Sequence, residues 1–435
     1  MRAVLLCLFL AAGVMAQQKD VSFRQVVGGS FAGFSEDEKA EKTWEATAKL
    51  MTPAPDGGIW DMQVIRLQSF RAGKPWAVFT SPNGTMVPAQ RSARGAADLQ
   101  ASSPAFTLAG KGWSWRSTNQ GDSFSVLAEV VAELDLAKPL SRRLRLRAPR
   151  LDATPVPGGT MMVFHGGVVA ERFGERITCE RLECLVGDGP GGETACRSVV
   201  ASGHVVRVLD RQTLRGDRAS FDPKDDSAEL TGKVELEEPE LTGSAQRLRH
   251  QPRLGVTQLF AGDGQSVKLR QLRKQQEPAD LSGELITIRR DAAAGTTRVE
   301  VEDNASYADP RSNLVARRLV ATEGRDGSSL VEAEGGVKGR MEANRFEAGR
   351  ARWDRAKRLL DLQEAPRVHE ARGLEAAGLS IRMDSLKDRI EIRSGPGLRA
   401  AVRLPSGEVG VARSEEHTSE LQSHSDLVCR LLLEK

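Results

Sequence analysis

Residues able to do chemistry are sparse in this sequence, and they are not grouped at catalytic spacings. The histidines of the central part of the chain show no serine, cysteine or acidic partner at the spacing of a triad or a metal site. These histidines are His165, His204, His250 and His369. A nucleophile elbow, an HExxH motif and a phosphate-binding loop are also missing. We therefore expect no catalytic residue, no metal site and no cofactor, and hence a protein that is not an enzyme.

Two carboxylate pairs, Asp225-Asp226 and Glu237-Glu238, are the remaining acid-base candidates. Both stand next to a proline, where a turn is expected. Charges in turns are usually solvated, so we expect these four carboxylates to face water.

A glycine-rich segment, Gly187-x-Gly189-x-x-Gly192, has the spacing of a dinucleotide-binding fingerprint. That loop should follow a strand and open a helix, whereas Pro190 interrupts it and residues 195–200 have the pattern of a strand. We interpret the segment as the turn of a β-hairpin.

Cysteines occur on both sides of that turn. Cys184 and Cys196 flank it, and Cys179 precedes them. Because an exported protein can oxidise its thiols, we predict a disulfide between Cys184 and Cys196, with Cys179 free. Non-reducing peptide mapping that finds both as free thiols would contradict this pairing. Three cysteines without a histidine at ligand spacing make a poor zinc site.

The two ends of the chain differ from the rest. Residues 1–16 combine Arg2, an apolar run and a small residue, Ala16, which is the pattern of a secretory signal peptide. The apolar run is too short for a membrane span. Residues 413–435 resemble a translated sequencing adapter, with a short amphipathic helix as the alternative. We expect an exported, periplasmic chain whose meaningful sequence stops near residue 412.

The chain has 435 residues and a formal net charge of +3, a length typical of about two to four domains. Its basic residues are interleaved with carboxylates, which argues against a nucleic-acid partner. Contact of basic residues with the anionic surface of the inner or outer membrane stays open.

The alternation of apolar and charged residues over short runs predicts an all-β fold. Val234-Glu-Leu-Glu and Arg389-Ile-Glu-Ile-Arg put apolar groups on one face and charges on the other. Residues 36–50 and 351–362 are the best helix candidates. The second corresponds to the turn at residues 221–226 in a repeat, so we interpret it as strand, turn and strand.

That repeat is the most informative pattern. Ala201-x-Gly203-x-Val205, followed by residues 214–222, returns 132 positions later as Ala333-x-Gly335-x-Val337 and residues 346–354. Shorter Gly-x-Val steps occur at Gly166 and Gly232. We expect each step to begin a strand whose glycine permits a bend, and the long repeat to mark duplicated β-modules.

Composition sets the boundaries of the modules. Five of the six tryptophans lie before residue 120, which marks a separate N-terminal part. We expect an N-terminal β-module with a linking strand at residues 40–150, and two repeated β-modules at residues 155–275 and 285–405.

The interior of such modules should be lined by the apolar residues of the repeats. They are Val205, Leu214, Phe221, Leu230, Val234 and Leu236, with Val337, Phe346, Trp353, Leu360 and Leu362 in the second copy. If the sheets close, these residues form an ordinary core. If the sheets stay open, they line an apolar groove able to hold acyl chains, and periodicity does not separate the two cases.

The ordered motifs resemble the organic-solvent-tolerance-A (OstA-like) family of periplasmic lipopolysaccharide-transport proteins. The resemblance rests on Ala201-x-Gly203-x-Val205, residues 214–222 and residues 230–236, and is looser over residues 285–405. The N-terminal module, with residues 108–115 before Phe124-Ser-Val126, resembles the inner-membrane-associated member of that system.

The resemblance implies tandem open β-jelly rolls that shield the acyl chains of lipopolysaccharide, with the apolar residues named above as the lipid-binding set. It also implies head-to-tail strand addition to other jelly-roll components of a transport bridge. This chain departs from the family by carrying several modules. A structural β-repeat protein of the envelope without a lipid ligand is the alternative, and a glycan-acting enzyme is a weaker one.

Overall fold

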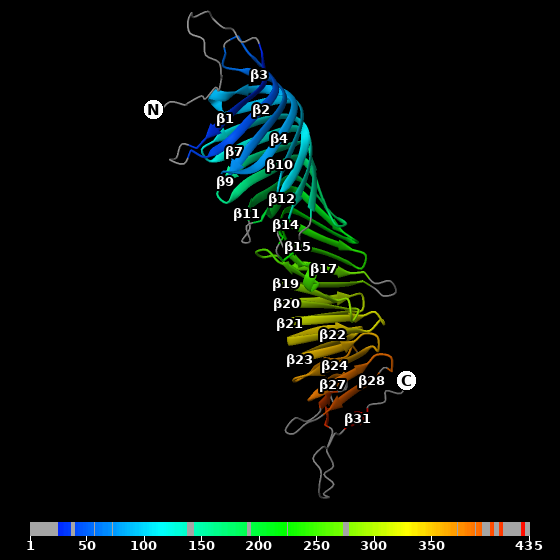
Figure 1. The fold of residues 1–435 in the computed structure, drawn as a ribbon. Helices are drawn as coiled ribbons and strands as arrows, with labels where there is room; N and C mark the ends of the chain where they lie inside the picture. Colours follow the sequence, from blue (N-terminus) through cyan, green and yellow to red (C-terminus); the bar gives the residue numbers. More distant parts are fainter. Residues whose placement is uncertain are drawn as a thin grey trace, which may run out of the picture. The chain divides into compact units, whose positions relative to one another are not determined.

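The computed structural model confirms the all-β expectation (Figure 1). It describes residues 25–35, 40–55, 57–71, 73–136, 143–188, 193–223, 225–272, 278–371, 373–387, 389–393, 401–403, 409–411 and 428–430. The expected signal peptide and most of residues 413–435 lie outside these ranges. The described part contains strands and two short 3₁₀ turns, and the helix candidate at residues 36–50 is wrong where it is described, because Lys42–Pro53 is a strand.

The chain divides into two units. Residues 1–101 and 111–124 belong to the first, and residues 102–110 and 125–435 to the second. Both repeated modules therefore lie in the second unit. The first unit contains the strands β1 (Val26–Phe34), β2 (Lys42–Pro53), β3 (Trp60–Arg71) and β4 (Lys74–Val87), and the turn η1 (Pro88–Gln90). Three strands contribute to both units: β5 (Ser92–Ser103), β6 (Phe106–Thr118) and β7 (Gly121–Asp135).

The first unit has an aromatic core, which explains its tryptophan content. β1 to β4 pair in antiparallel succession. The rings of Trp44 and Trp115 meet edge to face at 5.5 Å, and the indole of Trp113 donates to the Ser81 hydroxyl at 3.0 Å. Such pairs add to the hydrophobic gain of burying large rings.

The second unit is a long succession of antiparallel strands. Those before the middle of the unit are β8 (Arg143–Ala148), β9 (Arg150–Val156), β10 (Gly159–Arg172), β11 (Glu175–Asp188), β12 (Thr194–Leu209), β13 (Gln212–Asp222), β14 (Ser227–Glu238) and β15 (Leu241–Gln251). After the turn η2 (Pro252–Leu254) come β16 (Val256–Phe260), β17 (Val267–Gln271), β18 (Ala279–Gly283), β19 (Leu285–Asp291), β20 (Thr296–Asp309), β21 (Ser312–Gly324), β22 (Ser329–Met341) and β23 (Asn344–Asp354).

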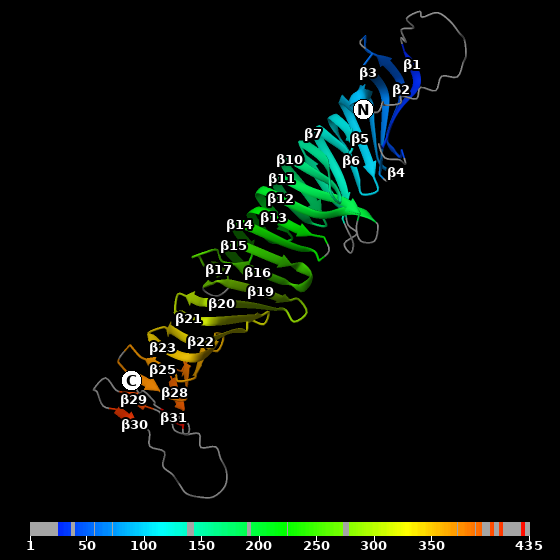
Figure 2. The same ribbon diagram turned by 90° about the vertical axis from the view of Figure 1, so that its left-hand side faces the viewer.

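The shorter strands of the last part are β24 (Leu359–Gln363), β25 (Arg367–His369), β26 (Glu375–Ala377), β27 (Ser380–Asp384), β28 (Arg389–Arg393), β29 (Ala401–Arg403), β30 (Val409–Val411) and β31 (Val428–Arg430). β23, a turn and β24 confirm the strand, turn and strand interpretation of residues 351–362. Figure 2 shows the labelled strands from β10 to β23 succeeding one another along the unit, with the short strands β16 and β17 side by side.

A bulge bends every second long strand of the repeats near its middle, namely β10, β12, β14, β20 and β22. Two consecutive residues there have positive φ: Gly166-Gly167, Gly203-His204, Gly232-Lys233, Asp303-Asn304 and Gly335-Gly336. The register between neighbouring strands shifts at these points. The Gly-x-Val steps therefore lie inside strands, and the expectation that they begin strands is wrong.

The bulges divide the second unit into two sheets that share strands. Residues before the bulge of β12 pair with one half of β11, and residues after it pair with the other half. Between the repeats, separate short strands continue each sheet: β16 and β19 in the first, β17 and β18 in the second. β20 then pairs with strands of both sheets. Neither sheet is interrupted between the two modules.

Directly paired residues form an unbroken ladder of buried apolar side chains along the first sheet. None is more than 5% exposed. This first-sheet ladder consists of Leu151, Phe164, Leu182, Ala201, Ala219, Leu230, Leu248, Leu259, Ile286, Val301, Leu319, Ala333, Ala351, Leu362, Ile381 and Ile392.

A second-sheet ladder runs parallel to it. Its members are Leu146, Ala170, Ile177, Arg207, Leu214, Leu236, Gly243, Leu269, Leu281, Tyr307, Leu314, Gly339, Phe346, Val368 and Ala376. Arg207 is the charged member of this ladder, at 2% exposure. The register thus carries an apolar interior through both repeats and inserts one charge into it.

The two residues of a bulge differ in the space available for a side chain. Alanine substitutions at the two positions are therefore expected to lower the unfolding free energy by different amounts. A Cβ at Gly335 would meet the Cβ of Arg317 at 2.8 Å, whereas one at Gly336 would meet nothing within 4 Å, and both have positive φ. We expect Gly336→Ala to cost about 1 kcal/mol from conformation alone, and Gly335→Ala to cost at least about 1 kcal/mol more because of the clash. Urea unfolding midpoints measure this difference, and equal effects would contradict the close approach.

Candidate binding site: the interior between the two sheets and its rim

The structure brings the predicted lipid-binding residues together in the interior. Leu230 and Leu362 belong to the first-sheet ladder; Leu214, Leu236 and Phe346 belong to the second-sheet ladder. Val205, Val234 and Val337 each follow a bulge. Phe221, Trp353 and Leu360 lie in a further paired row of the first sheet, which we call the rim row.

These residues are packed in this conformation. All are buried except Phe221, which is half-buried. The rim row runs through Val199, Phe221, Ala228, His250, Thr257, Ile288, Val299, Ala321, Val331, Trp353 and Leu360. The equivalence of Phe221 and Trp353 in the repeat is therefore also an equivalence of place in the fold.

Ion pairs join the strand ends of one sheet to the strand ends of the other, on the side opposite the bulges. We call this side the rim. The described residues contain three of these rim pairs: Arg172 with Asp226, Glu238 with Arg290, and Asp309 with Arg355. One partner of each stands four residues beyond the first residue after a bulge, namely Val168, Val234 and Ala305. The other stands two residues from a rim-row residue, namely Ala228, Ile288 and Trp353.

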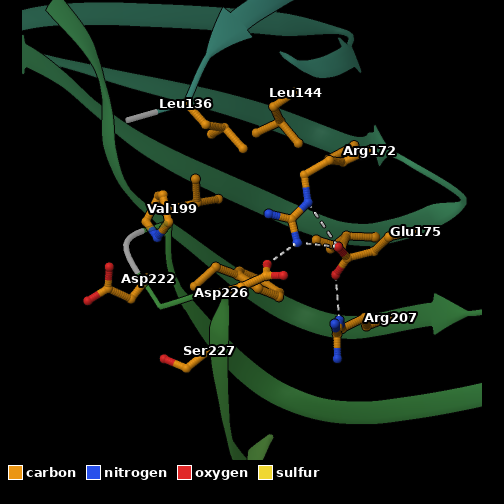
Figure 3. A pocket seen from close by; sticks show the side chains of 13 residues that line it. Leu136, Leu144, Arg172, Glu175, Val199, Arg207, Asp222, Asp226 and Ser227 are labelled. Atoms are coloured by element: carbon orange, nitrogen blue, oxygen red, sulfur yellow. Dashed lines mark hydrogen bonds and ion pairs between the residues drawn. The ribbon is translucent and has the colours of Figure 1, made fainter. Parts of the chain in front are cut away.

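The first rim pair belongs to a buried network (Figure 3). Arg172 Nη2 donates to Glu175 Oε2 and to Asp226 Oδ1, both at 2.7 Å. Arg207 Nε donates to the other oxygen of Glu175 at 2.5 Å. Burial by itself would raise the pKa of Glu175, but the guanidinium groups of Arg207 and Arg172 outweigh burial and lower it. Glu175 is therefore held as a carboxylate between two arginines.

The last rim pair closes over aromatic rings. Arg355 donates to Asp309 Oδ2 at 3.0 Å, and their side chains are 10% and 6% exposed. Its guanidinium lies over the rings of Tyr307 and Trp353, which themselves meet edge to face at 5.6 Å. Tyr307 comes from the second sheet and Trp353 from the first, so this contact joins the two sheets.

The polarity of the rim pairs is not constant. The second-sheet partner is Arg172 in the first module and Asp309 at the equivalent position of the second, and its first-sheet partner carries the opposite charge. Both repeats thus have a pair of opposite charges at the rim, with the arginine on the second sheet in the first module and on the first sheet in the second.

His250 lies in the rim row as its titratable member. Its Nδ1 is 3.0 Å from the Thr257 hydroxyl. Burial lowers the pKa of His250 to about 4, and the positive charges of Arg207 and Arg290 act in the same direction. The imidazole is therefore neutral at neutral pH.

Sequence reasoning missed the rim. The expectation of solvated turn charges is wrong for Asp226 and Glu238, whose side chains are each 15% exposed and paired with arginines. The partners stand about fifty residues apart in sequence, so no local spacing reveals them. Their common offset from the bulges is the signal that would have found them.

Other predicted groups are placed without a catalytic geometry. His165, His204 and His369 each contact one carboxylate, from Asp152, Glu180 and Glu375 respectively. Cys179, Cys184 and Cys196 are buried free thiols, and Cys184 lies in hydrogen-bonding contact with Cys196. The disulfide between these two residues stays a prediction. In the part of the chain that the structure describes, no group of three or more His, Cys, Asp or Glu side chains is placed to hold a metal ion.

Comparison with protein-family models and with curated proteins finds no match to this chain. Across the described ranges, no helix has the length and apolar character needed to cross a bilayer. The fold and site define a double-sheeted β-protein with a continuous apolar interior and an ion-paired rim.

Exchanging the charges of a rim pair tests whether the rim joins the sheets. We expect Asp309→Arg to lower the unfolding free energy by about 3 kcal/mol, because it removes one partner of a buried pair. The double variant Asp309→Arg with Arg355→Asp should recover at least half of that loss, because it copies the polarity found at Arg172 and Asp226. Urea unfolding of the variants measures both effects.

The exposed pair of Lys338 and Glu347 is the matched control. The same charge reversals there should change stability by less than about 1 kcal/mol. A rim pair that behaves like this surface pair would contradict its proposed role.

The buried His250 should make the protein less stable in mild acid. Its folded pKa of about 4 lies below the ordinary value of 6.5, so the unfolded chain binds the proton more readily. The contribution of the neutral, buried His250 to the unfolding free energy is fully present above pH 6.5. It decreases as the pH falls toward 4, by about 3 kcal/mol in total. We expect His250→Gln to reduce the slope of unfolding free energy against pH in that window. His204→Gln, at an exposed site, should leave the slope unchanged.

Proposed function

We propose that this chain is a non-enzymatic periplasmic protein that binds lipopolysaccharide and takes part in its transport from the inner to the outer membrane. The observation that carries the proposal is the pair of ladders, which continue from one repeat into the next without a break. An interior of this kind offers an acyl chain the same apolar surroundings over many strands.

The energetics suit transfer without bond making. Burial of each CH₂ group is worth about 0.8 kcal/mol. Because an acyl chain has a constant cross-section, each of its CH₂ groups is stabilised by a similar amount at every position along the ladders. Movement between equivalent positions such as Phe221 and Trp353 then changes the buried area little. The sugar part of the ligand would stay in water beyond the rim.

The packed interior sets a condition on this function. The ladder side chains fill the space between the sheets, so a ligand has to separate the edges joined by the rim pairs. The bulges, which lie on the opposite side, are the natural hinge for such a separation. The rim pairs are accordingly the groups that we expect to open during loading.

Strand addition is the proposed route of association with other jelly-roll components of the transport bridge. β1 pairs with β2 in the first unit. An unpaired edge is a template for a further strand. Peripheral contact with either membrane belongs to the same proposal.

A structural β-repeat protein of the envelope is the second candidate. The observation in its favour is that ten of the eleven predicted lining residues are buried, none of them more than 8% exposed. In that case the interior is only a core, and no ligand enters it.

Photocrosslinking separates these two functions. A photoreactive side chain at Phe221 or Trp353 should form adducts with lipopolysaccharide when the purified chain is incubated with it, because both positions lie in the rim row. Arg218, an exposed residue on the same strand as Phe221, is the control position. Adducts formed only from Arg218 would favour the structural candidate.

A further inference from the structure

Arg207 carries a donor group that the protein does not satisfy. The side chain is 2% exposed, its Nε donates to Glu175, and its Nη1 is buried without a hydrogen-bond partner. A buried N–H of a charged group without an acceptor is costly. An acceptor oxygen supplied from outside the chain would remove that cost.

A cavity of about 30 Å³ borders this arginine (Figure 3). That volume holds roughly two water-sized groups. Its apolar wall includes Ala170, Val199 and Phe221. Its polar wall holds Arg172 and Arg207 together with the carboxylates of Glu175, Asp222 and Asp226. The place where the apolar interior meets the rim thus has a hydrocarbon wall on one side and, on the other, two arginines that already bind carboxylates.

The second repeat also contains a buried arginine with a free donor, at a different place in the register, because the repeat counterpart of Arg207 is Gly339. Arg355 Nη1 is also buried without a partner, and its guanidinium lies over Trp353, the counterpart of Phe221. Each repeat therefore combines a rim-row aromatic residue, a rim pair and an arginine with a free donor.

We propose that these two places bind the phosphate oxygens of an acyl-chain amphiphile, with the phosphate replacing the rim carboxylates Asp226 and Asp309 on their arginines. This inference rests on the proposed function and specifies the headgroup that the site takes. A guanidinium presents paired N–H groups that match phosphate as well as carboxylate. A phosphate monoester carries more charge than one carboxylate, so it competes favourably once the chains are inside.

Neutralising the rim carboxylates provides the sharpest test. Asp226→Asn with Asp309→Asn keeps an oxygen acceptor but removes the competing charge. We expect the double variant to bind phosphorylated lipopolysaccharide at least about 5-fold more tightly than the unmodified chain, which corresponds to about 1 kcal/mol. Its affinity for enzymatically dephosphorylated lipopolysaccharide should not change. Glu229→Gln with Glu332→Gln, at exposed carboxylates on β14 and β22, removes the same number of charges and is the control for net charge.

A purely structural rim predicts no such selectivity. If the carboxylates only hold the sheets together, the double variant binds both preparations equally, and that result would overturn the inference. Circular dichroism melts establish that the variants are folded before binding is compared.

The arginine side gives a second, independent measurement. Arg355→Met should weaken binding of phosphorylated lipopolysaccharide by about 10-fold and leave the dephosphorylated form unaffected. Arg352→Met, exposed on β23 just before the turn that contains Arg355, should change neither. Equal loss for both preparations would mean that Arg355 only packs against the rings.

A binding measurement with inorganic phosphate distinguishes a site for the free phosphate ion from a site for the phosphate group of an amphiphile. If phosphate alone binds the unmodified chain with the affinity of phosphorylated lipopolysaccharide, the site takes the free ion and the amphiphile is excluded. If the unmodified chain binds neither preparation of lipopolysaccharide, the proposed function itself fails. Equal binding of both preparations by every variant rejects the headgroup site alone.

Discussion

The structure of the second unit depends on one backbone constraint, the pair of left-handed residues in the middle of each bulged strand. Each pair shifts the register by a residue, so the side chains before and after it still face the same interior. The bulges recur on alternate strands, and their alignment divides one set of strands into two sheets. The ladders, the rim and the cavity beside Arg207 all take their positions from it. At Gly203, Gly232 and Gly335 a Cβ would meet the Cβ or carboxylate of a residue on the preceding strand, which explains why glycine occupies the first position.

Much of this architecture was predictable from local patterns. Alternation identified the strands, and the 132-residue repeat identified Phe221 and Trp353 as equivalent. The interior residues followed from the same period, because a half-buried strand has to put its apolar side chains on one face. The predicted position of the Gly-x-Val step was wrong by half a strand. A glycine that bends the backbone gives the same sequence pattern whether a strand begins at it or continues through it.

The rim could not be predicted in this way. Asp226 and Glu238 have the sequence surroundings of ordinary turn charges, and their partners Arg172 and Arg290 look like ordinary strand-end cations. Only the fold of two sheets onto each other brings these ends together. Arg207 is a similar case: it shares the alternation of the buried Ala201 and Val205, but an arginine at such a position is expected to face solvent until its tertiary pairing with Glu175 is known. Burial of charge is decided by tertiary pairing, which local propensity does not record.

The reversed polarity of the first and last rim pairs bears on how a duplicated chain assembles correctly. Two similar modules joined in one chain can exchange strands during folding, which is a common failure of repeat proteins. If β20 took the place of β10, Asp309 would face Asp226 and Arg172 would be left against Arg355. Like charges would then meet at the closed edge in both modules, at a cost that correct pairing avoids. The reversed polarity therefore makes the rim of each repeat complementary to its own strands and repulsive to the equivalent strands of the other repeat.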